Sequence, residues 1–156
     1  MPRIELIVDT CSMVEFEPFV TFATAVREWL VSGAALLRIP NKCIDEMNAI
    51  IHNERKPHKS RLSAYQALVL LYSLSKLGCV EFFGETDKLA DAVILAEGLA
   101  LRSAGKSVFV LTNDRALASD LLSLNALTNV ARGRGQVKVY RLGKNGELAE
   151  FTSGIR

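Results

Sequence analysis

Four short apolar runs, separated by longer segments with helical spacing, constrain the fold of this chain more than any other feature. The runs cover residues 3–9, 35–39, 79–83 and 107–112, and they are rich in leucine, isoleucine, valine and phenylalanine. Such runs are typical of strands that are buried on both faces of a parallel sheet. The alternation of strands and helices therefore predicts an α/β fold with right-handed crossovers.

The segments between these runs carry helix patterns with recognisable ends. Apolar residues recur at three- and four-residue spacing over 12–31, where Ser12 can cap the helix and Gly33 follows its end. Further helices are expected from about Asn41 and over 61–77, 88–104 and 115–124, with a polar loop over 52–60. Helices on both faces would give a three-layer α/β/α sandwich around a central, mainly parallel sheet of four to five strands.

The last part of the chain has the pattern of a β-hairpin. The runs 137–142 and 147–151 flank a turn that contains Asn145-Gly146, and this dipeptide is a strong signal for a tight hairpin. A chain of 156 residues that is 49% hydrophobic can bury one sizeable core. We therefore expect a single domain over residues 1–156, with the hairpin at its C-terminus.

Composition excludes several classes of protein. Charged residues break every apolar stretch well before the ~20 residues that a membrane helix needs, and the first residues lack the cleavage site of a secretory signal. We expect a cytoplasmic protein with no membrane partner. Cys11, Cys43 and Cys79 are odd in number and widely spaced, which favours reduced thiols over disulfides or zinc ligands. The net charge is only +2, so nucleic-acid binding must depend on local clusters.

Acidic residues stand where predicted strands end and predicted helices begin. Asp9 ends the first strand and Asp114 follows the fourth, and the carboxyl ends of parallel strands meet at one edge of a sheet. Glu46 lies in the early turns of the helix after the second strand, and Asp91 lies near the start of its own helix. Carboxylates that converge in this way repel each other unless a cation lies among them. Magnesium, which prefers carboxylate and water oxygens, fits that need.

Each of these acids has an alternative interpretation. Asp45 is adjacent to Glu46 and Asp87 lies four residues before Asp91, so either neighbour can exchange roles with the acid we favour. Acids at strand ends and helix starts are also good capping residues, and a carboxylate in a first helical turn is stabilised by the helix dipole. The sequence leaves the functional and the capping interpretations open.

The ordered set of acids resembles the pattern of the PIN-domain family of ribonucleases. The resemblance spans most of the chain and is carried by the strand-ending Val8-Asp9-Thr10, by the acid early in the next helix, by Asp91-Ala92-Val93-Ile94-Leu95-Ala96, and by Leu111-Thr112-Asn113-Asp114-Arg115. It implies a PIN-like fold and a metal-dependent endoribonuclease that hydrolyses RNA phosphodiester bonds with Mg²⁺ or Mn²⁺. The implied catalytic metal ligands are Asp9, Glu46, Asp91 and Asp114. The residues that would orient ligands or water are Thr10, Ser12, Thr112 and Asn113.

Basic residues that could contact RNA phosphates gather in two segments and beside the last acid. Each phosphate contact adds a salt-dependent contribution to binding. The expected RNA-binding residues are Arg55, Lys56, Lys59, Arg61, Arg115, Arg132 and Arg134. The alternative is that the first segment is a solvated loop and that the second, glycine-containing segment is a linker.

Two other functions compete with the ribonuclease. One is a catalytically inactive PIN-like module that binds RNA or protein. The other is an aspartyl phosphotransfer domain with Asp9 as nucleophile, although Cys11 stands where a dehalogenase-like site has its second acid. The family resemblance further implies a toxin of a toxin–antitoxin pair, because stand-alone members often have this role, with an antitoxin partner and a homodimer.

Overall fold

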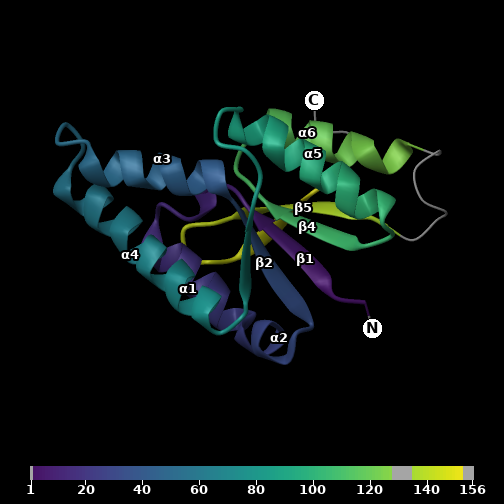
Figure 1. Cartoon of the computed structure of the whole chain (residues 1–156), viewed down its shortest axis with the longest axis horizontal. Helices are drawn as coiled ribbons and strands as arrows, with labels where there is room; N and C mark the ends of the chain where they lie inside the picture. Colours follow the sequence, from purple (N-terminus) through teal and green to yellow (C-terminus); the bar gives the residue numbers. More distant parts are fainter. Residues whose placement is uncertain (1, 128–134, 153–156) are drawn as a thin grey trace.

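The computed structural model describes residues 2–127 and 135–152 and contains a six-stranded sheet in the order β3-β2-β1-β4-β5-β6 (Figure 1). Its strands are β1 (Ile4–Val8), β2 (Ala35–Pro40), β3 (Val80–Phe83), β4 (Ser107–Leu111), β5 (Val137–Leu142) and β6 (Leu148–Phe151). All neighbouring strands are parallel except β5 and β6. The predicted α/β fold with a mainly parallel sheet is confirmed. The C-terminal hairpin belongs to the same sheet, because β5 pairs with β4.

Helices cover both faces of this sheet and complete the three predicted layers (Figure 1). They are α1 (Phe16–Ala25), α2 (Arg27–Ser32), α3 (Asn41–His52), α4 (His58–Lys76), α5 (Ala90–Ser103) and α6 (Arg115–Ser123), with short 3-10 turns η1 (Thr10–Ser12) and η2 (Leu124–Ala126). Helices α1 to α4 pack on one face, and α5 and α6 pack on the other. Within the described residues, no helix combines the length and the apolar character needed to cross a membrane.

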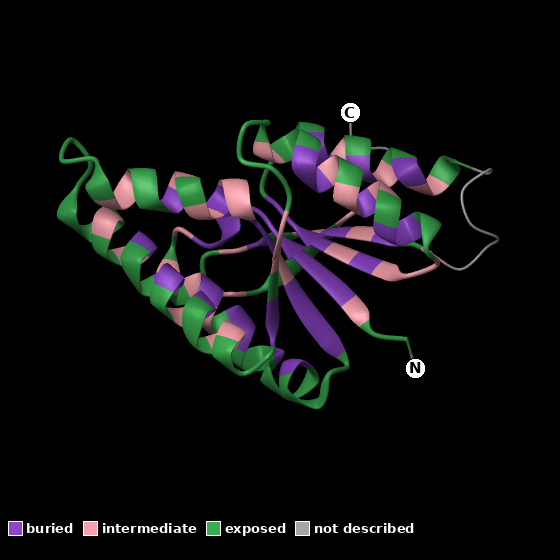
Figure 2. Ribbon diagram, in the orientation of Figure 1, coloured by how far each residue is buried: buried purple, intermediate pink, exposed green. Residues whose placement is uncertain are grey.

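The alternation of side chains along β1 divides the interior into two cores. Leu6 and Val8 face the core under α1 to α4, whereas Ile7 faces the core under α5 and α6. Successive side chains of a strand point to opposite faces, so a strand buried on both faces needs apolar residues at nearly every position. Figure 2 shows this continuous burial through the central strands. The apolar run of β1 therefore has a direct structural cause.

The segment 12–31 is not the single helix that its spacing predicts. The chain first forms η1, then α1 begins only at Phe16, and α1 and α2 are separated at Val26. Pro18 has no backbone N–H to donate, and it therefore fits within the first turn of a helix but not in its interior. A helix that began at Ser12 would place this proline in its second turn, which explains the later start of α1.

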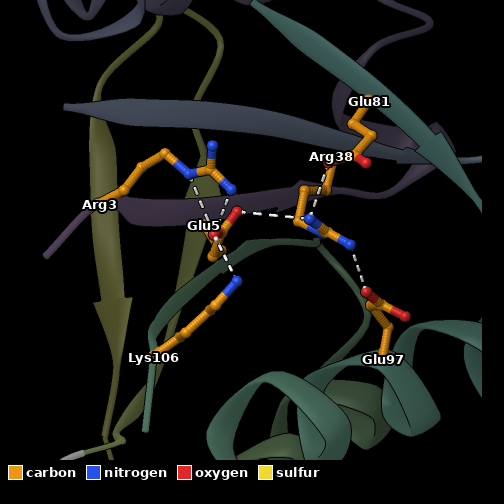
Figure 3. A network of polar contacts seen from close by, with 6 residues as sticks. All are labelled: Arg3, Glu5, Arg38, Glu81, Glu97 and Lys106. Carbon is orange, nitrogen blue, oxygen red and sulfur yellow. Dashed lines mark hydrogen bonds and ion pairs between the residues drawn. The ribbon is translucent and has the colours of Figure 1, made fainter. Parts of the chain in front are cut away.

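One carboxylate is buried on the sheet itself, near the start of β1. Glu5 is 1% exposed and makes ion pairs with three cations: Arg3 at 2.9 Å, Arg38 at 3.6 Å and Lys106 at 3.6 Å (Figure 3). Arg38 also pairs with Glu81 on β3 at 3.1 Å and with Glu97 on α5 at 2.6 Å. A buried charge is tolerated only when it is paired in this way. The network therefore joins three strands to α5.

Candidate metal centre

The ends of β1 and β4 bring Asp9 and Asp114 to the same edge of the sheet. The Asp9 amide donates a hydrogen bond of 3.0 Å to the carbonyl of Leu111, the last residue of β4. The buried Thr112 hydroxyl donates to Oδ2 of Asp9 at 3.0 Å and accepts from the Asp114 amide at 3.1 Å. One side chain therefore bridges the two acids.

The Asp9 carboxylate is held in a fixed orientation. Its side chain caps η1, with Oδ1 accepting a hydrogen bond of 2.8 Å from the Thr10 amide. Oδ2 accepts from the Thr112 hydroxyl and, at 3.5 Å, from the Cys11 thiol. Asp9 is only 8% exposed. Its orientation is therefore set by backbone and buried side chains rather than by solvent.

Asp114 caps α6 and still keeps one oxygen available. Its Oδ1 accepts hydrogen bonds from the Ala116 amide at 2.9 Å and the Leu117 amide at 3.1 Å. Its Oδ2 accepts none from any residue that the structure describes. The capping interpretation and the functional interpretation of this acid are thus compatible, because each uses a different oxygen.

Glu46 from α3 and Asp91 from the first turn of α5 complete the acidic cluster. Burial raises the pKa of Glu46, and the negative charge of Asp9 raises it further, while the nearby Thr10 hydroxyl lowers it. Asp91 is exposed, but partial loss of solvation at the start of α5 raises its pKa, followed by the charges of Asp9 and Asp114. Charges that shift each other's titration lie in one shared field. The charge of Asp9 therefore acts on both Glu46 and Asp91, and that of Asp114 acts on Asp91.

The alternative acids differ from the favoured ones at only one of the two positions. Asp45 is exposed on α3 whereas Glu46 is half-buried, but Asp87 and Asp91 are both exposed. A further acid that sequence reasoning missed, Asp120 in α6, raises the pKa of Asp91. No local pattern identifies Asp120, because its proximity to Asp91 depends on the packing of α5 against α6.

The residues expected to orient ligands or water differ in burial and in their hydrogen bonds. They are Thr10, Ser12 and Asn113, together with the Thr112 described above. The Thr10 hydroxyl is buried and, within the described residues, has no partner at hydrogen-bond geometry. Ser12 is buried in η1, with its hydroxyl 4.0 Å from the Cys11 sulfur. Asn113 is exposed, and its amide donates to that sulfur at 3.3 Å. Thr10 therefore places a buried hydroxyl near Glu46 without a well-formed hydrogen bond to it.

Two thiols also contact Asp9, which the sequence did not indicate. Cys43 lies 3.9 Å from Oδ1, and burial raises the pKa of its thiol to about 12. Cys11 is exposed, although its apolar neighbours in the sequence favour a buried thiol, and partial loss of solvation and then the charge of Asp9 raise the pKa of this thiol. Metals bind thiolates rather than thiols, so both cysteines act here as weak hydrogen-bond donors to the carboxylate.

The donor set fits a hydrated divalent cation. Within residues 2–127 and 135–152, no three histidine, cysteine or acidic side chains lie close enough together to hold an ion directly. Mg²⁺ usually keeps several waters and binds through one or two carboxylates. The free Oδ2 of Asp114, the Glu46 and Asp91 carboxylates and the buried Thr10 hydroxyl are suitable partners for such an ion and its waters.

The predicted RNA-binding residues are spread over several surfaces. Lys56 and Lys59 are exposed and line a groove beside α1 and α4, whereas the Arg61 Nε donates a hydrogen bond of 2.8 Å to the Ile51 carbonyl. Arg61 therefore ties α4 to α3. Arg55 and Arg115 are exposed. Arg132 and Arg134 lie outside the described residues.

Comparison with known proteins bears on the fold alone. No family model matches the sequence, and no curated protein matches it either. Among solved structures, the chain is similar to the PIN domain endonuclease Utp24, with a TM-score of 0.52 and 12% identity over 97% of this chain and 96% of that chain. The chain has a PIN-like fold.

This PIN-like fold confirms the architecture that the motif resemblance implied. The similarity covers nearly the whole of both chains, and so includes the strands that Asp9 and Asp114 follow. Active sites of open α/β sheets lie at the carboxyl ends of the strands. The acidic cluster occupies that position in the PIN-like sheet.

Proposed function

We propose that the chain is an endonuclease that hydrolyses RNA phosphodiester bonds with the help of Mg²⁺ or Mn²⁺. The convergence of Asp9, Glu46, Asp91 and Asp114 at one edge of a PIN-like sheet carries this proposal. The structurally similar protein is a PIN domain endonuclease, which supports phosphodiester hydrolysis as the class of reaction. The preference for RNA follows from the motif resemblance.

In this mechanism some side chains of the cluster would hold the cation and another would accept a proton. A bound divalent cation would neutralise the carboxylates and polarise the phosphate. Asp9, oriented by the Thr10 amide and the Thr112 hydroxyl, and Asp114, through its free Oδ2, would hold it. Glu46, whose raised pKa favours proton uptake, is suited to accept a proton from an attacking water.

The phosphotransfer alternative lacks a second acid. Cys11 stands where a dehalogenase-like site has this acid. The inactive-module alternative makes no use of the acidic cluster. The toxin role, the antitoxin partner and the homodimer stay predictions of the resemblance, and the nuclease proposal does not depend on them.

A cleavage assay with the full chain tests this function. Labelled single-stranded RNA and single-stranded DNA are incubated with Mn²⁺, with Mg²⁺ and with EDTA. We expect RNA cleavage that requires the cation and falls to background in Asp114→Asn, a substitution that keeps an oxygen to cap α6. Absence of cleavage by the wild type with either cation, or full cleavage by Asp114→Asn, would contradict the proposal.

A further inference from the structure

A groove of about 510 Å³ opens beside the acidic cluster. Cys11 and Asn113, which neighbour Asp9 and Asp114 in the sequence, line one end of it. The turn between β5 and β6 forms its other wall, with Arg141 and Lys144 among the lining residues. The groove therefore connects the candidate metal centre with two cations of the C-terminal hairpin.

A second groove of about 790 Å³ continues this path along α1. It shares Glu15, Pro18 and Lys144 with the first groove and extends to Lys56 and Lys59 near the start of α4. Lys144 thus stands where the two grooves meet. An extended polymeric ligand that enters at the acidic cluster would pass Arg141, then Lys144, and then the lysines of α4 and its preceding loop.

The wall that carries Arg141 and Lys144 is preformed. Gly146 has a φ of 80°, and a Cβ at this position would lie 2.5 Å from the Thr21 side chain of α1. The Glu147 carboxylate accepts a hydrogen bond of 3.0 Å from the Asn145 amide within the turn. The hairpin turn therefore packs closely on α1 (Figure 1), and ligand binding need not order it.

The cations of this path are unpaired within the part of the chain that the structure describes. No ion pair or side-chain hydrogen bond there involves the side chains of Arg141, Lys144, Lys56 or Lys59. The two grooves together are lined by these four cations and by three carboxylates, Glu15, Glu17 and Glu147, of which Glu147 is engaged by the hairpin turn. A row of unpaired cations that begins beside an acidic cluster matches the charge of a phosphodiester backbone.

We propose that this path binds the backbone of one strand of nucleic acid. Arg141 and Lys144 contact phosphates close to the bond that is cut, and Lys56 and Lys59 contact phosphates further along. The first groove has the size of a small-ligand pocket, which suits a single strand rather than a duplex. The proposal rests on the proposed nuclease function and adds Arg141 and Lys144, which the sequence did not single out.

Binding of fluorescein-labelled oligouridine and oligodeoxythymidine, followed by anisotropy at several salt concentrations, tests the path. All proteins carry Asp114→Asn so that the probe stays intact. Arg141→Gln and Lys144→Gln are compared with Lys76→Gln, which removes an equal charge from the exposed end of α4 and lines neither groove. A duplex probe of the same sequence completes the set.

We expect each groove variant to bind the single strand several-fold more weakly, with the slope of log K against log salt reduced by about 0.7 per cation. Lys76→Gln should behave as the parent. Weaker binding of oligodeoxythymidine than of oligouridine would assign the strand as RNA, and equal binding would extend the site to both. The path is wrong if the double variant Arg141→Gln Lys144→Gln binds like Lys76→Gln, or if the duplex binds more tightly than the single strand.

The binding experiment and the cleavage assay can fail independently of each other. Loss of binding in the groove variants, together with a wild type that cleaves nothing, would support the path and refute the nuclease. Metal-dependent cleavage by the wild type, together with unchanged binding by the groove variants, would support the nuclease and refute the path. Because the substituted side chains are exposed, unchanged thermal unfolding is expected for every variant.

Discussion

The Thr112 hydroxyl donates a hydrogen bond of 3.0 Å to the Asp9 carboxylate, across 103 positions of the sequence. The same hydroxyl accepts a hydrogen bond of 3.1 Å from the Asp114 amide. Thr112 is completely buried directly after β4. The residue thus sets the relative position of the first and last acids of the candidate metal centre.

Replacing this hydroxyl tests the link between the two acids. Thr112→Val keeps the shape of the side chain but leaves the Asp9 carboxylate and the Asp114 amide each without one partner. We expect a loss of about 1–3 kcal/mol in the free energy of unfolding, measured by urea denaturation. Thr112→Ser, which retains the hydroxyl, should lose less. A valine variant as stable as the wild type would show that the hydrogen bonds contribute nothing.

Two substitutions at Asp114 separate its cap from its proposed metal role. Asp114→Asn keeps an oxygen for the Ala116 and Leu117 amides, whereas Asp114→Ala loses the cap and about 1 kcal/mol of stability. Mn²⁺ should raise the melting temperature of the wild type, because it binds the folded state, and should raise that of Asp114→Asn much less. An equal shift in both proteins would make Asp114 a cap and nothing more.

The raised pKa of Glu46 predicts a pH dependence for the metal-free protein. Because its pKa in the folded state lies above the ordinary value of 4.5, the folded state binds more protons than the unfolded state in the interval between the two. The stability that protonated Glu46 contributes is therefore lost as pH rises through the folded pKa. In EDTA, Glu46→Gln should gain stability relative to the wild type as pH rises from below 4.5 to neutral.

Melting temperatures of the two proteins across this pH range provide the measurement. Asp45→Asn is the matched control, because Asp45 is the adjacent, exposed acid of the same helix. The Glu46→Gln difference is read relative to this control. A Glu46→Gln difference that is flat, or that shrinks as pH rises, would mean that neither burial nor the charge of Asp9 raises the pKa of Glu46.

The buried network around Glu5 predicts unequal effects of its two central residues. Glu5 is 1% exposed, and its Oε2 has no hydrogen-bond partner among the described residues. Arg38→Met would leave this carboxylate paired only with Arg3 and Lys106, which are both half-exposed. We expect a cost of about 3–5 kcal/mol, as for other broken buried pairs. Glu5→Gln should cost less, because Arg38 keeps Glu81 and Glu97. Chemical denaturation measures the free energy of unfolding of both variants. A larger loss of this free energy in Glu5→Gln than in Arg38→Met would contradict this account.

Local sequence patterns were enough to locate the strands and most of the helices. The apolar run before Asp9 and the run before Thr112 each describe a strand that is buried on both faces, and this pattern depends on only a few adjacent residues. Parallel pairing then places their ends at one edge. The meeting of Asp9 and Asp114 was therefore predictable, because it follows from topology alone.

Other features depend on contacts between distant segments and had no local signal. The approach of Asp120 to Asp91 follows from the packing of α6 on α5. Arg141 and Lys144 line the same groove as Cys11 and Asn113 only because the hairpin turn packs on α1. The late start of α1, in contrast, had a local signal in Pro18, which the apolar spacing of the segment outweighed.

Anomalous scattering from a crystal soaked in Mn²⁺ tests the central claim most directly, because it locates the ion without reference to activity. The account predicts a peak among the carboxylates of Asp9, Glu46, Asp91 and Asp114, and no such peak in Asp114→Asn at the same Mn²⁺ concentration. A wild-type crystal with Mn²⁺ bound only elsewhere on the protein would contradict it.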